Sequence, residues 1–170
     1  MEPGTSWRKQ CWTTARAALM PHIPIEILRG RLKRAAELGL DYRTYAGIRA
    51  ATGCDVVAVL FSSNALGAPA ILRSRADRLG DINALRIGLV TPPLQMDAMS
   101  DLELDEVHPS PHVLDSFTRQ RAALRAALGK TPSDAAVLIG AYHMERDWVA
   151  AGKLAGYIDA DRYFGAHATR

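Results

Sequence analysis

Apolar residues recur at spacings of three and four along PIEILRGRLKRAAELGLD, residues 24–41. This period predicts a helix with one apolar side. The positions that share this side are Ile25, Leu28, Leu32 and Ala35. Gly39 is typical of a helix end and Asp41 of a helix start, so a second helix is expected from Asp41 to Gly53. Two short helices are therefore expected before residue 54.

The run CDVVAVLF, residues 54–61, follows this second helix and supports three interpretations. As the second half of a helix-turn-helix unit it lacks side chains that read bases. As a buried strand it is rich in β-branched residues, and ALRIGLV, residues 84–90, is its candidate parallel neighbour. As a helix that begins at Asp55 and ends at Gly67, it is apolar on all sides, like a helix enclosed by others. We prefer the enclosed helix and keep the strand open.

Helical spacing also marks the last third of the chain. Residues 110–129 and 131–152 both carry apolar residues at helical intervals, with Ser110 and Thr131 as candidate caps. Gly129 separates the two segments, so they are expected to form an antiparallel helical hairpin. The tail is expected to add a short helix that packs Tyr163 and Phe164.

These patterns together predict a mainly α fold, a compact helical domain with a C-terminal antiparallel helical hairpin. The alternative is an α/β fold with a small parallel sheet from 55–61 and 84–90. In either case we expect one domain with three parts. They are a basic helical part over 1–90, an acidic proline-flanked linker or loop over 91–110, and the hairpin with its tail over 111–170.

Composition limits the class of protein. The chain of 170 residues is 48% hydrophobic and holds no apolar run near the ~20 residues that span a bilayer. The first twenty residues lack the apolar core of a secretory signal. Two cysteines without a CxxC pattern predict neither a disulfide framework nor a zinc site. We therefore expect a cytoplasmic protein that binds no membrane, and its arginine- and alanine-rich composition is compatible with a GC-rich bacterial genome.

Positive charge is concentrated in the first half. Residues 1–90 hold 13 Lys and Arg against 7 Asp and Glu, whereas residues 91–110 hold five acids and no base. A basic half can follow the phosphates of a nucleic acid, although it is also an ordinary solubilising surface. The residues that such a nucleic-acid site would use are Arg29, Arg31, Lys33, Arg34, Arg43 and Arg49.

No complete catalytic or metal-binding motif is present. If the strand interpretation holds, polar residues after the two strands would meet at one edge of the sheet, where open α/β proteins bind ligands. The candidate catalytic residues for that case are Ser62, Ser63, Asn64, Thr91 and His143. His108 and His112 are weak candidates for a metal site beside the acidic run. No cofactor is expected.

The sequence is most typical of a small regulatory or adaptor module that binds and does not catalyse. Its expected partner is another protein or a second copy of itself, through the helical hairpin. A nucleic-acid-binding protein and an α/β enzyme remain the alternatives.

Overall fold

The computed structural model describes residues 7, 9–12, 23–68 and 70–165. The expectation that no secretory signal is present rests on residues 1–20, most of which lie outside these. The elements, in chain order, are α2 (Ile25–Glu37), α3 (Tyr42–Thr52), β1 (Ala58–Ser62), α4 (Arg73–Ala76), β2 (Leu85–Val90), η1 (Met96–Met99), β3 (Glu106–Pro109), α5 (Phe117–Leu128), η2 (Ser133–Ala135), β4 (Ala136–Gly140), η3 (His143–Glu145), α6 (Arg146–Gly152), β5 (Gly156–Asp159) and α7 (Ala160–Gly165).

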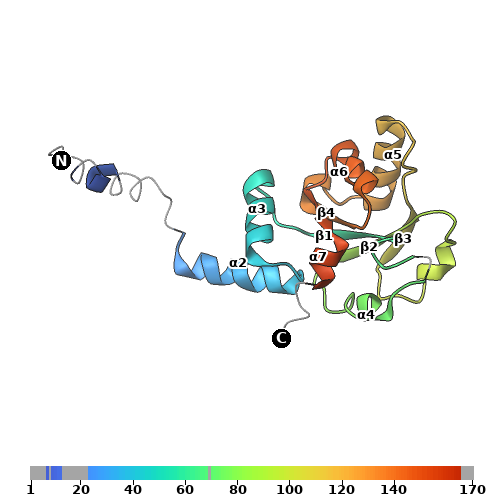
Figure 1. Ribbon diagram of the computed structural model, residues 1–170, viewed down its shortest axis with the longest axis horizontal. Helices are drawn as coiled ribbons and strands as arrows, with labels where there is room; N and C mark the ends of the chain where they lie inside the picture. The colour runs from blue at the N-terminus through green and yellow to red at the C-terminus, as the bar shows by residue number, and fades with distance from the viewer. Residues whose placement is uncertain (1–6, 8, 13–22, 69, 166–170) are drawn as a thin grey trace, which may run out of the picture.

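The five strands form a single parallel sheet in the order β3-β2-β1-β4-β5. Figure 1 shows α5 and α6 on one side of this sheet and α4 on the other. Side chains from both faces of β1 are therefore buried, and all five of its residues lie in the interior. The fold is α/β, and the prediction of a mainly α fold with an antiparallel helical hairpin is wrong.

The hairpin fails in its second half. α5 is a helix, capped by Ser116 in place of Ser110, but the segment expected to be one helix over 131–152 contains β4 and then α6. β4 pairs in parallel with β1 on one side and β5 on the other. A strand buried on both faces has no alternating pattern, so its apolar run resembles that of a buried helix.

The same physical reason corrects the enclosed helix expected between Asp55 and Gly67. Residues 58–62 form β1, which pairs in parallel with β2 from Ala58–Leu85 to Ser62–Leu89. The two strands of the alternative interpretation are therefore present within slightly different bounds. They are members of a sheet of five strands, whereas a sheet of two was expected.

The first two helices follow the predicted signals. α2 spans Ile25–Glu37, and the side chain of Asp41 accepts a hydrogen bond from Thr44 N at 2.9 Å, which caps α3. Gly53 ends α3 with φ of 75°, a left-handed conformation that favours glycine. The expected C-terminal helix is also confirmed, because α7 buries Tyr163 and Phe164.

The acidic segment 91–110 contributes one edge strand to the sheet. It was expected to be a loop or linker with at most one helical turn, and it contains η1 followed by the edge strand β3. β3 pairs with β2 from Ile87–Glu106 to Val90–Pro109. Pro109 is the last residue of this edge strand, a position where a missing N–H costs little.

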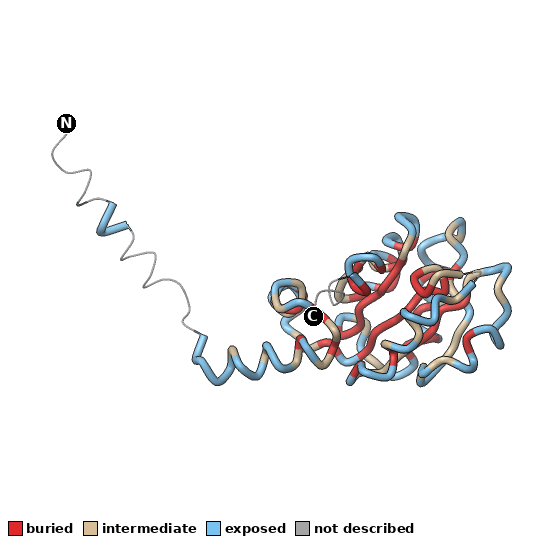
Figure 2. Tube along the Cα trace, turned by 60° about the horizontal axis from the view of Figure 1, so that its bottom comes forward, coloured by how far each residue is buried: buried red, intermediate tan, exposed pale blue. Residues whose placement is uncertain are grey.

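Two cores lie on opposite faces of the sheet. Phe61, Ile139 and Tyr163 belong to the core beneath α3 and α7, whereas Leu60, Leu138 and Trp148 belong to the core beneath α5 and α6. Figure 2 shows the buried strands at the centre and α2 projecting from the body with most of its length exposed. Among the described helices none is both long and apolar enough to cross a membrane.

Candidate functional site

The middle of the sheet contains a switch in the direction of winding. From β1 the chain proceeds to β2 and β3 on one side, and then crosses to β4 and β5 on the other. β1 and β4 are hydrogen-bonded neighbours at this switch. Ligands of open α/β sheets bind outside the carboxyl ends of the strands at such a point. The carboxyl-edge site therefore comprises residues 62–64 at the end of β1 and 141–145 after β4.

Two completely buried serines stand at the end of β1. Ser62 Oγ accepts a hydrogen bond from Ala65 N at 3.0 Å, which tightens the turn that follows. Ser63 Oγ accepts one from Thr91 N at 3.0 Å, which joins the ends of β1 and β2. The structure thus brings Ser62, Ser63 and Thr91 to one edge, and the two serine hydroxyls hold backbone groups there.

A buried carboxylate joins β1 to β4. Asn64 Nδ2 donates to Glu145 Oε1 at 2.9 Å, and Glu145 Oε2 accepts from Ala141 N at 2.7 Å and Tyr142 N at 3.1 Å. Glu145 is only 1% exposed. Burial of a charge is costly unless hydrogen bonds replace water, and these three donors do so. Glu145 was not among the predicted site residues, because residues 131–152 were expected to form one helix.

Gly140 makes room for this arrangement. A Cβ at this position would lie 2.6 Å from Glu145 Oε2 and 2.5 Å from the ring of Tyr157. Burial, and then the charge of Glu145, raises the pKa of Tyr157, so its hydroxyl stays protonated. That hydroxyl donates to Tyr142 O at 3.4 Å. The end of β4 is therefore closed by internal contacts.

His143 and the Thr91 hydroxyl take no part in this network. His143 lies in η3 and is exposed. Thr91 Oγ1 is buried and has no hydrogen-bond partner among the described residues. The candidate catalytic residues are accordingly split, with Ser62, Ser63, Asn64 and Thr91 at one edge and His143 facing solvent.

The residues proposed for nucleic-acid binding are also divided. Arg34 Nε donates to Asp55 Oδ2 at 3.0 Å, and its other nitrogens donate to Glu37 and to backbone carbonyls. Arg49 lies 3.8 Å from Asp55. Both arginines stabilise the junction of α2, α3 and β1. The exposed members of the set are Arg29, Lys33 and Arg43, and Arg31 is half-buried.

The two candidate metal-binding histidines contact groups close in sequence. His108 Nε2 lies 2.9 Å from Glu106 Oε2 on β3, and His112 Nδ1 accepts from Leu114 N at 3.2 Å. Within the described ranges, no three His, Cys, Asp or Glu residues are grouped so that they could hold a metal ion.

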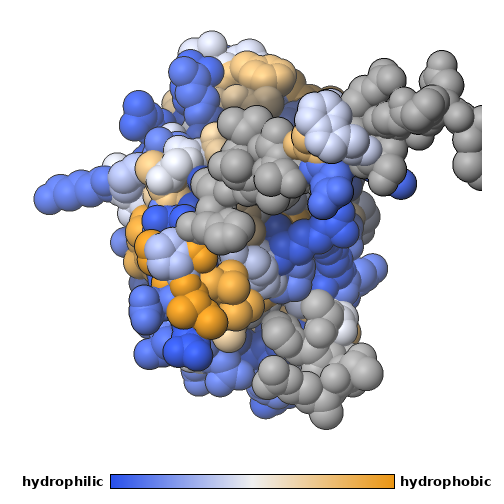
Figure 3. All heavy atoms as spheres, turned by 90° about the vertical axis from the view of Figure 1, so that its left-hand side faces the viewer, coloured by the Kyte–Doolittle hydropathy of each residue, from blue (hydrophilic) through white to orange (hydrophobic). Residues whose placement is uncertain are grey.

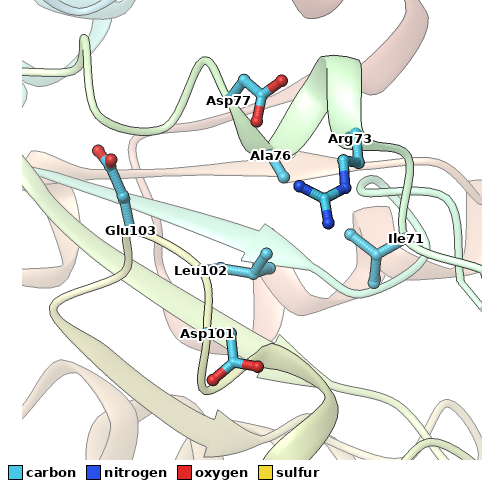
Figure 4. Close-up of a pocket in the computed structure, with 7 residues that line it drawn as sticks. All are labelled: Ile71, Arg73, Ala76, Asp77, Asp101, Leu102 and Glu103. Atoms are coloured by element: carbon cyan, nitrogen blue, oxygen red, sulfur yellow. The ribbon is translucent and has the colours of Figure 1, made fainter.

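A hollow of about 330 Å³ opens between α4 and the segment after η1, and sequence reasoning did not find it. We call it the acidic hollow; its lining residues are Ile71, Arg73, Ala76, Asp77, Asp101, Leu102 and Glu103. Figure 4 shows Arg73 pointing into the space from one side, with Asp101 and Glu103 on the opposite wall. The two walls lie on separate crossover connections, so only the folded sheet brings them together.

A second surface is the exposed half of α2 with the residues before it, 23–33, which we call the arm. Its apolar side chains face solvent: Ile23 is 44% exposed, Ile25 59%, Ile27 48% and Leu32 46%. Figure 3 views the molecule from the side where α2 lies and shows hydrophobic atoms gathered in a patch among hydrophilic ones. The predicted apolar side of this helix is present. Of the four residues predicted to form it, only Ala35 is buried.

No protein family model, curated protein or solved structure matches this chain.

Proposed function

We propose that the protein is a non-catalytic α/β binding module, of the adaptor or regulatory kind, that contacts a protein partner through the arm. The exposure of Ile25 and Leu32 on one side of a well-formed helix carries this proposal. Contiguous exposed apolar surface bordered by polar residues is typical of interaction sites. Amphipathic helices are a recurrent means of such recognition.

The hydrogen bonds of the carboxyl edge support the non-catalytic part of the proposal. A serine nucleophile needs a neighbouring base, whereas Ser62 and Ser63 bind backbone N–H groups. An acid or base needs an oxygen within reach of substrate, whereas both oxygens of the buried Glu145 are occupied. These hydrogen bonds hold together the segments that follow β1, β2 and β4.

The proposed setting is the cytoplasm. Cys11 is exposed and Cys54 is half-buried, and both are free thiols. Free thiols are typical of a reducing compartment.

Photo-crosslinking tests the binding role. A photo-reactive amino acid is placed at position 32 of the full chain and, as the control, at the exposed position 125 on α5. We expect position 32 to yield a discrete crosslinked complex that disappears when Ile25→Asp is added, and position 125 to yield none. The readout is the mass of the adduct on a denaturing gel.

Two results would overturn the proposal. One is the absence of any adduct specific to position 32. The other is turnover of a generic carboxylic or phosphoric ester that is lost in Ser62→Ala, since that variant removes only a buried hydroxyl.

A further inference from the structure

We propose that the partner of the arm is a second copy of this chain, and that two copies exchange arms, each arm seating on the acidic hollow of the other copy. This inference rests on the proposed binding function and deepens it by naming the partner. It follows from the match between two surfaces of one molecule.

One side of the arm carries apolar residues together with charged residues. Ile25, Arg29 and Leu32 are separated by four and three residues, so they lie on the same side of α2. Glu26 and Lys33 flank that side at its two ends. All five residues are exposed, and Lys33, whose side chain is 81% exposed, lies 3.8 Å from Glu37 of the same helix. The charge along this side therefore changes from negative at Glu26 to positive at Arg29 and Lys33.

The acidic hollow has the complementary pattern. Its apolar lining residues are Ile71, Ala76 and Leu102, and both Arg73 and Asp77 lie on the α4 side. Asp101 and Glu103 lie on the opposite wall, as Figure 4 shows.

Asp77 and Asp101 are exposed and form no salt bridge with another described residue. The carboxylate of Glu103 lies against Gly80 and within electrostatic reach of Arg86.

These patterns fix how the arm is oriented. Glu26 of one copy faces Arg73 of the other, while Arg29 and Lys33 face Asp101 and Glu103. Ile25, next to Glu26, and Leu32, next to Lys33, lie above the apolar lining residues. Complementary charges of this kind set the register and orientation of an interface, and apolar anchors in a pocket supply most of its affinity.

The arm does not contact the acidic hollow of its own copy. Figure 1 shows α2 at one end of the molecule and α4 toward the other, and Figure 2 shows the arm pointing away from the body. A contact between the two surfaces is therefore intermolecular. Because each copy offers one arm and one hollow, a two-fold arrangement satisfies both contacts and closes at a dimer.

Sedimentation equilibrium of the full chain, with charge-reversed variants, tests the exchange. The arm variant is Arg29→Glu with Lys33→Glu, and the hollow variant is Asp101→Lys with Glu103→Lys. We expect the wild-type chain to dimerise and each variant to raise the dimer Kd about tenfold or more. The control, Arg125→Glu in α5 with Lys130→Glu in the turn that follows, changes two exposed residues outside both surfaces and is expected to leave Kd unchanged.

Mixing the two variants provides the decisive measurement. In the mixed dimer a reversed arm meets a reversed hollow, while a normal arm meets a normal hollow, so affinity returns toward the wild-type value. Circular dichroism is used to check that each variant is folded. A wild-type chain that is monomeric, or a dimer that neither reversal weakens, would overturn the exchange.

Other partners give different results. A crosslink from position 32 to a different protein, with the chain itself monomeric, overturns the exchange and leaves the binding function standing. Binding of the monomer to vesicles of phosphatidylcholine and phosphatidylserine in equal parts also overturns it. If position 32 forms no adduct at all, the proposed function fails as well.

Discussion

At the scale of single residues, Glu145 has the largest structural role of the groups at the carboxyl edge. Its two oxygens accept hydrogen bonds from Asn64, Ala141 and Tyr142, which belong to the loops after β1 and β4. The loss of a buried acceptor leaves its donors without partners, which costs more than the hydrogen bonds contribute on balance. One carboxylate therefore joins the loops that follow the two central strands, β1 and β4.

Glu145→Ala is expected to lower the free energy of unfolding by about 2 kcal/mol, because three partly buried donors lose their acceptor. Urea unfolding followed by circular dichroism measures the change. Asp134→Ala, which removes an exposed carboxylate with no described partner, is the matched control and is expected to change stability by less than about 0.5 kcal/mol. Equal effects of the two substitutions would show that Glu145 does not hold the edge together.

At the scale of elements, the edge strand β3 is attached by its hydrogen bonds to β2 and by one ion pair. Arg86 Nε and one terminal nitrogen donate to the two oxygens of Asp105 at 3.0 and 2.8 Å. These hydrogen bonds from Arg86 hold the pKa of Asp105 below its usual range. Arg86 is part of β2 and Asp105 directly precedes β3, so the ion pair aligns the two strands.

The ion pair predicts a change of stability with pH. Because the pKa of Asp105 is lower in the folded chain than in the unfolded chain, its stabilisation is complete above the ordinary carboxyl pKa. It is lost as the pH falls through the folded-state value. Asp105→Asn should therefore cost about 1 kcal/mol near neutral pH and almost nothing in acid. Urea unfolding of the wild-type chain and the variant, near neutral pH and in acid, measures this difference in the free energy of unfolding.

Asp97→Asn, in the same segment, is the control for this prediction and is expected to cost little at either pH. Its side chain is exposed and has no described partner. A cost of Asp105→Asn that is equal in acid and at neutral pH would contradict the role of the Arg86 pair.

Elements that depend on neighbours in sequence could be predicted, and elements that depend on distant pairing could not. The start of α3 at Asp41 and its end at Gly53 are set by capping groups within a few residues. β4 resembles a helix in its apolar pattern, and only hydrogen bonds to β1 and β5 make it a strand. The meeting of Ser63 with Thr91 followed from the strand alternative, whereas Glu145 depended on β4 and was missed.

At the scale of the whole molecule, the apolar side of α2 is the feature that its own fold leaves unsatisfied. Most large apolar residues of the described ranges lie in two cores, yet Ile25 and Leu32 stay exposed on one side of a helix. Apolar area of this kind gains free energy when a second surface covers it. Exchange of arms explains why the helix retains an apolar side that its own body does not cover.

Hydrogen exchange at increasing protein concentration tests this view of the molecule. If arms are exchanged, amides of residues 29–33 become protected as the dimer forms, because local opening of α2 first requires dissociation. At a total concentration one hundred times Kd about 7% of the chains remain monomeric, so protection should rise about fifteenfold. Amides of α5 should not change with concentration, and the variant with Arg29→Glu and Lys33→Glu should show no rise in α2. Protection of α2 that is independent of concentration would mean that the arm stays exposed in solution.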